Sequence, residues 1–304
     1  MKSIIFLYAF TLLYATCYCR QAMNDAQYKE GVKCFDNKDY PCALACFEKT
    51  IKANPNSGAA YYMHGMTCMN LGQAKQAIAD LEKSIALHYI VPLSYATCGV
   101  LKANLQDFKG ALEDFDTQVK LYPQIAESYS NRGVARYELR DFKGALADYN
   151  KAIQMDPNAA AYWSQRGLAK AQLGSLQEGL SDLNKSLELA PGNADAYSNR
   201  GLIELMMKDY TVALKDLDKS ISLDSTEMEA HQYRGRVKIN LKDYKGALND
   251  LNFILKYKPN DLQALYLKVS ATFFLGDKAG GCDAYKKCLQ LGGDHLPEID
   301  KICK

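Results

Sequence analysis

The five residues YSNRG at 129–133 return at 197–201, and the related stretch WSQRG lies midway between them at 163–167. Successive copies are 34 residues apart, with no insertion or deletion between them. A fixed spacing of this length is typical of repeat proteins, in which each repeat forms one supersecondary unit. The triplet Asn-Arg-Gly is therefore interpreted first as part of a repeat and only then as a binding motif.

A 34-residue frame that begins at Asn24 places the same residue types at the same positions. Position 8 is glycine in seven repeats: Gly31, Gly65, Gly99, Gly133, Gly167, Gly201 and Gly235. Position 20 is small: Ala43, Ala77, Ala111, Ala145, Gly179, Ala213 and Ala247. Position 24 is large and apolar: Phe47, Leu81, Phe115, Tyr149, Leu183, Leu217 and Leu251. Position 4 is mostly aromatic, and position 32 is often proline.

These positions predict two antiparallel helices in every repeat. Helices approach closely only where side chains are small, so we expect Gly133 to contact Ala145 and Gly201 to contact Ala213. Aspartate recurs at position 16, where its side chain is expected to cap the second helix. The six residues are Asp39, Asp107, Asp141, Asp209, Asp243 and Asp277. Proline at position 32 then prevents the second helix from continuing.

This pattern of aromatic, Gly, Ala, large apolar and Pro positions resembles the tetratricopeptide repeat family. The resemblance covers eight repeats over residues 24–295 and implies an all-α fold, a right-handed superhelical solenoid. Residues 296–304 are expected to form a short C-terminal capping helix. Position 11, usually tyrosine in the family, departs from the pattern: Cys34, Cys68, Lys102, Arg136, Lys170, Glu204, Lys238 and Thr272. The eighth repeat inverts the small contact, with Val269 opposite Gly281.

Arginine at position 7 is accompanied by aspartate at position 23. Because the second helix of one repeat packs on the first helix of the next, we expect each arginine to pair with the preceding repeat's aspartate. The predicted pairs are Arg132 with Asp114, Arg166 with Asp148, Arg200 with Asp182, Arg234 with Asp216, and Lys268 with Asp250. The arginine of the triplet is then structural, and only its asparagine remains for binding.

The resemblance implies that the first helices line a concave groove. Its middle part would carry an uncharged stripe: Ser130, Asn131, Gln165, Ser198 and Asn199. Such a stripe suits the backbone of an extended peptide, although solvated polar residues on a wet surface are an equally simple interpretation. Family members that hold a C-terminal carboxylate use Lys and Asn at set positions, and only Asn131 and Asn199 match, so no carboxylate clamp is predicted.

The N-terminal part of the groove is expected to be apolar. It would be lined by Tyr28, Tyr62, Met63, Met66, Met69, Leu93 and Val100. Flexible methionines suit a partner helix or an apolar peptide, so we predict a binding site here. The alternative is that the N-terminal segment or a second copy of the chain covers the cluster.

The first 19 residues resemble a secretory signal peptide. A basic start is followed by the apolar run IIFLYAFTLLYA at 4–15, which is shorter than a membrane span, and then by small residues. An uncleaved anchor and lipidation at Cys17 or Cys19 are the alternatives. We expect no membrane span after cleavage.

Eight cysteines follow the expected cleavage point, in two groups too far apart to bridge within one solenoid. The favoured disulfide is Cys282 with Cys303, which would fasten the C-terminal tail to the last repeat. Cys42 and Cys46 share a helix face, but no histidine pair follows, so neither a zinc site nor any cofactor is predicted.

The net charge of +2 and the lack of a long basic run argue against a nucleic-acid partner. Four scattered histidines and the absence of a phosphate loop or nucleophile elbow argue against an enzyme. We therefore predict an exported scaffold that binds an unidentified protein or peptide, placed in the periplasm or envelope of a Gram-negative bacterium, or secreted. The alternative is a binder of glycans or cell wall.

Overall fold

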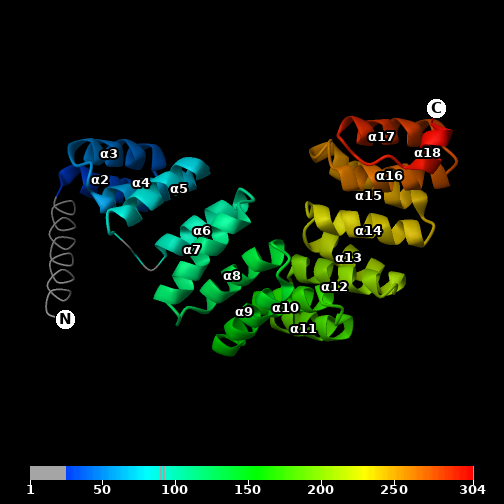
Figure 1. Ribbon diagram of the computed structural model, residues 1–304, viewed down its shortest axis with the longest axis horizontal. Helices are drawn as coiled ribbons and strands as arrows, with labels where there is room; N and C mark the ends of the chain where they lie inside the picture. Colours follow the sequence, from blue (N-terminus) through cyan, green and yellow to red (C-terminus); the bar gives the residue numbers. More distant parts are fainter. Residues whose placement is uncertain (1–24, 90, 92, 304) are drawn as a thin grey trace. The chain divides into compact units, whose positions relative to one another are not determined.

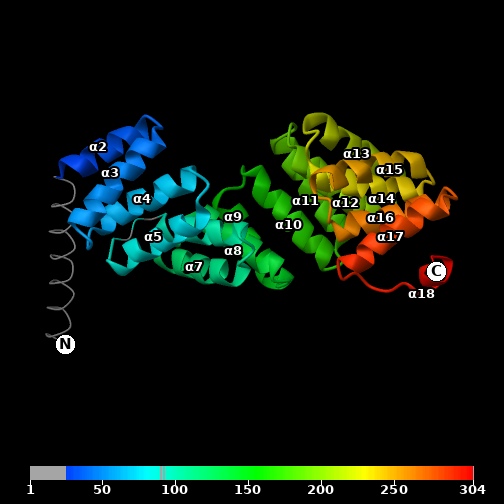
Figure 2. The same ribbon diagram turned by 90° about the horizontal axis from the view of Figure 1, so that it is seen from above.

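The computed structural model describes residues 25–89, 91 and 93–303 (Figures 1 and 2). These residues form α-helices joined by short turns, with no strand among them. The predicted signal peptide, residues 1–19, lies outside the described residues. No described helix is long and apolar enough to cross a membrane. The chain divides into two compact units, Met1–Asp148 and Tyr149–Lys304, which are considered separately.

The first unit contains three complete helix pairs, α8, and the beginning of α9. Within it, consecutive helices pack against each other. The helices are α2 (Ala26–Asp36), α3 (Tyr40–Ala53), α4 (Gly58–Asn70), α5 (Ala74–Ala86), α6 (Ser94–Asn104), α7 (Phe108–Leu121), α8 (Ala126–Glu138) and α9 (Phe142–Met155).

The second unit begins within α9 and contains four helix pairs and a short last helix. Its helices are α10 (Ala160–Gln172), α11 (Leu176–Leu189), α12 (Ala194–Met206), α13 (Tyr210–Leu223), α14 (Met228–Asn240), α15 (Tyr244–Tyr257), α16 (Leu262–Phe274), α17 (Lys278–Gln290) and α18 (Pro297–Ile302). In both units the helix bounds follow the 34-residue frame, so the predicted all-α fold of helix-turn-helix repeats is confirmed.

Glycine at position 8 allows the two helices of a repeat to touch. A Cβ added to Gly201 would lie 3.3 Å from the carbonyl oxygen of Ala213, and one added to Gly167 would lie 2.8 Å from that of Gly179. Such distances are too short for an ordinary side-chain contact, so the predicted contact of Gly201 with Ala213 is confirmed. The contact of Gly133 with Ala145 stays a prediction.

The turn between the helices of a repeat uses a left-handed residue followed by the aspartate cap. Position 15 has a positive φ in all eight repeats: Lys38, Gly72, Gln106, Arg140, Gly174, Lys208, Lys242 and Gly276. The next residue then accepts a backbone N–H of the second helix, as Asp107 does from Gly110 at 3.0 Å. Five of the six predicted caps form, and Asp209 has no side-chain cap bond. Sequence analysis missed position 15, although three glycines mark it.

The predicted ion pairs had the wrong partner. Each arginine at position 7 binds the aspartate at position 23 of its own repeat, because these positions face each other across one helix pair. The bonds from Arg Nη2 to Asp Oδ1 measure 2.6 Å (Arg132 to Asp148), 2.7 Å (Arg166 to Asp182), 2.9 Å (Arg200 to Asp216) and 2.5 Å (Arg234 to Asp250). Asp114 is bound instead by Lys102, at 2.8 Å.

A link to the preceding repeat does exist, but it goes to position 25. Nη1 of the same arginines donates to Asp116, Asn150, Asn184 and Asp218 at 2.7–2.9 Å. Lys268, expected on Asp250, donates to Asn252 at 2.9 Å. Position 25 was not considered at the sequence level, although it carries only Asp or Asn at these five sites.

The cations at position 11 complete this arrangement. Arg136, Lys170 and Lys238 reach the aspartates of their own repeats at 2.7, 2.9 and 2.8 Å. We call positions 7, 11 and 23 of a repeat, with position 25 of the preceding one, the ion cluster. In the four repeats where position 11 is Lys102, Arg136, Lys170 or Lys238, the residue that replaces the family's tyrosine serves charge pairing in the helix-pair core.

The C-terminal segment packs on the last repeat, as predicted. Cys282 of α17 and Cys303 after α18 form a disulfide with a Cα–Cα distance of 5.3 Å. Tyr285 adds a second connection, because its hydroxyl accepts the backbone N–H of Leu296 at 2.6 Å and donates to Asp300 at 2.9 Å. Residues 296–303 are thus fixed to the second unit by covalent and polar contacts.

Candidate binding groove

The first unit has a cavity of about 280 Å³ between its first helices. It is lined by Met69 of α4, by residues of α6, and by Asn131 of α8, with further lining from the loop before α8. Leu93 and Val100 contribute apolar surface and are 55% and 41% exposed. Apolar side chains left this exposed around a concave surface are typical of a binding site.

The predicted apolar cluster is only partly available to a partner. Tyr62, Met63, Met66 and Met69 are half-buried and pack against the cores of the first two repeats. Burial also raises the pKa of the Tyr62 hydroxyl. The prediction for Tyr28 is wrong, because this residue is buried and packs on Phe47, with ring centroids 5.7 Å apart.

Tyr61 is the aromatic residue at position 4 of the second repeat, a framework position for which burial is expected, but it is half-buried. Tyr62 and the three methionines are half-buried as well, so Tyr61 is not covered more than they are. Leu93 and Val100 are therefore the apolar groove residues with the largest exposure, and they come from a different helix pair than the methionines.

The predicted polar stripe is reduced in the same way. Ser130 and Ser198 are buried, at 3% and 1% exposure, so they do not line a groove. Asn131 is half-buried and lines the cavity of the first unit. In the second unit, Gln165 is half-buried, and Asn199 donates to Ser164 Oγ of the preceding repeat at 3.1 Å. Asn199 therefore also has a structural role between repeats.

The recurring triplet is explained mainly by the fold. The arginine binds its aspartate and lies over the aromatic ring at position 4: Arg132 over Tyr129, Arg166 over Trp163 and Arg200 over Tyr197, at 5.6, 4.7 and 5.5 Å. The glycine makes the helix contact and the serine before the triplet is buried. The asparagine or glutamine is also partly exposed, and unlike the arginine it takes no part in the ion cluster.

Sequence analysis missed the part of the cavity contributed by α7, by Ile125 before α8 and by the first turn of α8. Ile125, Glu127 and Ser128 line it together with Gln118 of α7. Gln118, Ile125 and Ser128 lie outside the positions that the family uses for its groove, whereas Glu127, at position 2 of its repeat, is one of them. The proline at 123 signals the turn, but not which side chains of that turn face the cavity.

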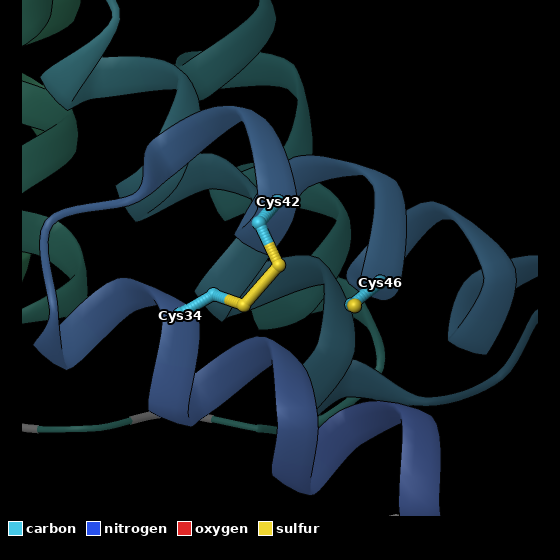
Figure 3. Close-up of side chains that lie close together, drawn as sticks. All are labelled: Cys34, Cys42 and Cys46. Atoms are coloured by element: carbon cyan, nitrogen blue, oxygen red, sulfur yellow. A yellow bond between two sulfur atoms is a disulfide. The ribbon is translucent and has the colours of Figure 1, made fainter.

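The cysteines of the first repeat form a second polar feature of this unit. Figure 3 shows Cys34 of α2 joined to Cys42 of α3, with Cys46 beside the disulfide. The three sulfurs lie within 4.8 Å of one another, and Cys46 is a free, buried thiol. Sequence analysis left the pairing within this group open.

Models of the tetratricopeptide repeat match residues 58–87, 126–159 and 164–227, in the same register as the helix pairs. The chain belongs to the tetratricopeptide repeat family. This fold is typically a non-catalytic scaffold. No curated protein matches the chain.

Solved structures of tetratricopeptide repeat proteins share the fold at low identity. Cut9 in the Cut9–Hcn1 heterotetramer of the APC/C has a TM-score of 0.69 at 14% identity, over 87% of this chain and 52% of that chain. Yeast Tom70 has a TM-score of 0.62 at 18% identity, over 87% and 57%. A tetratricopeptide repeat protein of Parabacteroides merdae has a TM-score of 0.62 at 18% identity, over 81% and 97%. The chain thus spans just over half the length of Cut9 and Tom70.

Proposed function

We propose that the chain is an exported scaffold that binds an apolar peptide or protein segment in the groove of the first unit. The observation that carries the proposal is the cavity at α4, α6 and α8, with Leu93 and Val100 exposed at its wall. Apolar contact would supply the binding energy, and Asn131 would hydrogen-bond the partner's backbone. No enzymatic activity is assigned to the chain.

Export is supported by the cysteines as well as by the apolar N-terminal run. Two disulfides, Cys34–Cys42 and Cys282–Cys303, fasten the first and the last repeat. Disulfides persist in oxidising compartments, such as the periplasm or the cell exterior. We propose the envelope of a Gram-negative bacterium or secretion as the location, with lipidation at Cys17 or Cys19 as the alternative mode of attachment.

A peptide-display selection against the purified chain tests the binding proposal, followed by fluorescence polarisation with a selected peptide. The double variant Leu93→Glu with Val100→Glu should weaken binding by at least about tenfold, because it places unpaired charge in the contact. The matched control is Val212→Glu, since Val212 is 50% exposed but lies on the second helix of its repeat, α13.

A glycan array run in parallel distinguishes the competing function. Binding to cell-wall glycans, with no peptide selected, would replace the peptide-binding proposal by a glycan-binding one. Equal peptide affinity of the double variant and the wild type would place the peptide site elsewhere in the chain.

A further inference from the structure

The second repeat builds its ion cluster from different chemistry. Positions 7, 11 and 23 hold His64, Cys68 and Asp80, where the fourth repeat holds Arg132, Arg136 and Asp148. Position 25 of the preceding repeat is Glu48, which corresponds to Asp116. The fold therefore brings one imidazole, one thiol and two carboxylates to a place that elsewhere holds fixed cations.

Among the described residues, Asp80 has a histidine but no Arg or Lys as its partner, unlike the buried aspartates of the later repeats. Its contacts in the described chain are His64 Nδ1 at 2.7 Å, Cys68 Sγ at 4.0 Å and Gln76 Nε2 at 3.1 Å. Asp148 and Asp182 each receive two cationic side chains. Burying a carboxylate without a matching cation costs free energy. A bound cation would therefore compensate the negative charge of this cluster.

We propose that His64 Nδ1, Cys68 Sγ and Asp80 Oδ2 bind a zinc ion inside the second repeat. The three atoms lie within 4.8 Å of one another and all three residues are buried. One thiolate, one carboxylate and one neutral imidazole balance the charge of Zn²⁺, and all three are ligands that zinc prefers.

The distances fit this ion with a small adjustment. Tetrahedral zinc with bonds of about 2.0 Å to N and O and about 2.3 Å to S holds its ligand atoms about 3.3 to 3.6 Å apart. Sγ lies 3.7 Å from Nδ1 and 4.0 Å from Oδ2, and Nδ1 lies 2.7 Å from Oδ2. Binding needs the Nδ1–Oδ2 distance to open by roughly 0.6 Å and the Sγ–Oδ2 distance to close by roughly 0.5 Å, which side-chain rotation can provide.

The surroundings supply the supporting contacts that zinc sites use. His64 is nine-tenths buried, and its Nε2 makes no hydrogen bond, with Glu48 Oε1 at 4.0 Å. With Nδ1 on the metal, Nε2 carries the proton and can donate it to this carboxylate, as metal-bound histidines usually do. Gln76 holds the second oxygen of Asp80.

The residues of the cluster also change the pKa of the Cys68 thiol. Burial and the charges of Asp80 and Glu48 raise the pKa of Cys68 to about 11. A divalent cation reverses this effect, because it displaces the thiol proton on binding.

Titration of the purified chain with Co²⁺, without reductant, tests the site. Cobalt on a thiolate in a tetrahedral site absorbs in the visible and near ultraviolet, and Zn²⁺ should remove this signal. We expect one equivalent to bind to the wild type and to Cys46→Ser, which lacks the free thiol of the first repeat. Cys68→Ser and Asp80→Asn should lose the signal. His231→Ala should keep it, because the aspartate that His231 contacts, Asp250, is already paired with Arg234 and Lys238.

Three outcomes would overturn the proposal. The first is the absence of a thiolate absorption signal in the wild type. This outcome does not depend on whether any variant folds. The second is a signal that survives Cys68→Ser, and the third is a signal lost in Cys46→Ser, which would assign the metal to the first repeat's cysteines. Circular dichroism and the thermal midpoint of each variant show whether a lost signal comes from unfolding.

Discussion

Arg200 binds Asp216 of its own repeat through two hydrogen bonds, of 2.5 Å from Nε and 2.9 Å from Nη2. Among the described residues no other cationic side chain reaches this carboxylate, because position 11 of the sixth repeat is Glu204. In the seventh repeat, Asp250 receives both Arg234 and Lys238. The two repeats therefore differ in how many cations support the same buried aspartate.

Replacing Arg200 should cost more stability than replacing Arg234. Arg200→Met leaves Asp216 and Glu204 together without a cation, at a cost of about 3 kcal/mol, whereas Arg234→Met leaves Lys238 in place and should cost roughly half as much. Urea denaturation followed by circular dichroism measures both losses. Equal losses would contradict the role given to position 11.

Glu204 should make the stability of the chain depend on pH. Burial, followed by the charge of Asp216, raises its pKa to about 7 from an ordinary 4.5. Between these values the folded chain holds a proton that the unfolded chain has lost, so stability falls as the pH rises from about 4.5 to about 7.

Glu204→Gln should remove this fall and raise the free energy of unfolding at pH 8 by roughly 1 to 3 kcal/mol, since one pKa unit is about 1.4 kcal/mol. The exposed Glu138, changed to Gln, is the matched control and should alter little. A pH profile of the thermal midpoint that is the same for Glu204→Gln and wild type would show that the carboxyl is already ionised in the fold.

The close helix contact at Gly167 should not accept a methyl group. Its Cβ would lie 2.8 Å from the carbonyl oxygen of Gly179, so Gly167→Ala is expected to destabilise the chain by about 1 to 3 kcal/mol. Gly192→Ala, where nothing lies within 4 Å, is the control. Comparable thermal midpoints for the two variants would refute the contact.

Reduction should release the C-terminal segment from the last repeat. The Cys282–Cys303 bond closes a loop over a separation of 21 residues, so its loss should cost about 3 kcal/mol locally. Limited proteolysis with and without reductant, read by mass spectrometry, should show cleavage near 296–303 only after reduction or in Cys303→Ser. Cleavage at the same rate in the oxidised chain would show that the bond does not hold the tail.

The helix pairs were predictable from sequence because glycine and alanine allow the close helix contact and proline ends the second helix. These residues recur with a strict 34-residue period, so their positions mark the helices. The partner of each arginine was not, since positions 23 of the same and of the preceding repeat are both plausible neighbours of position 7. Burial was also hard to foresee: Tyr28 packs on Phe47, and Ser130 is small enough to be enclosed by the neighbouring helices. The 34-residue period fixes which helix a residue occupies, but not how far its side chain is covered.

The same limit explains why the zinc ligands of the second repeat were missed. His64 and Cys68 share one helix, α4, whereas Asp80 lies on α5, so no short motif unites them. Only the comparison with Arg132, Arg136 and Asp148 shows that the three positions meet. The 34-residue frame did contain the signal, because positions 7, 11 and 23 of the second repeat hold no basic residue other than histidine.

Methyl-labelled methionine gives the most direct test of the binding groove. Met69 lines the cavity of the first unit, whereas Met206, which is 41% exposed, lies on α12 of the second. On titration with a selected apolar peptide, we expect the Met69 methyl resonance to shift to saturation, with Met206 unchanged. The shift should disappear in the Leu93→Glu and Val100→Glu double variant. A peptide that binds the wild type while leaving Met69 unchanged would contradict the proposal that this groove is the binding site.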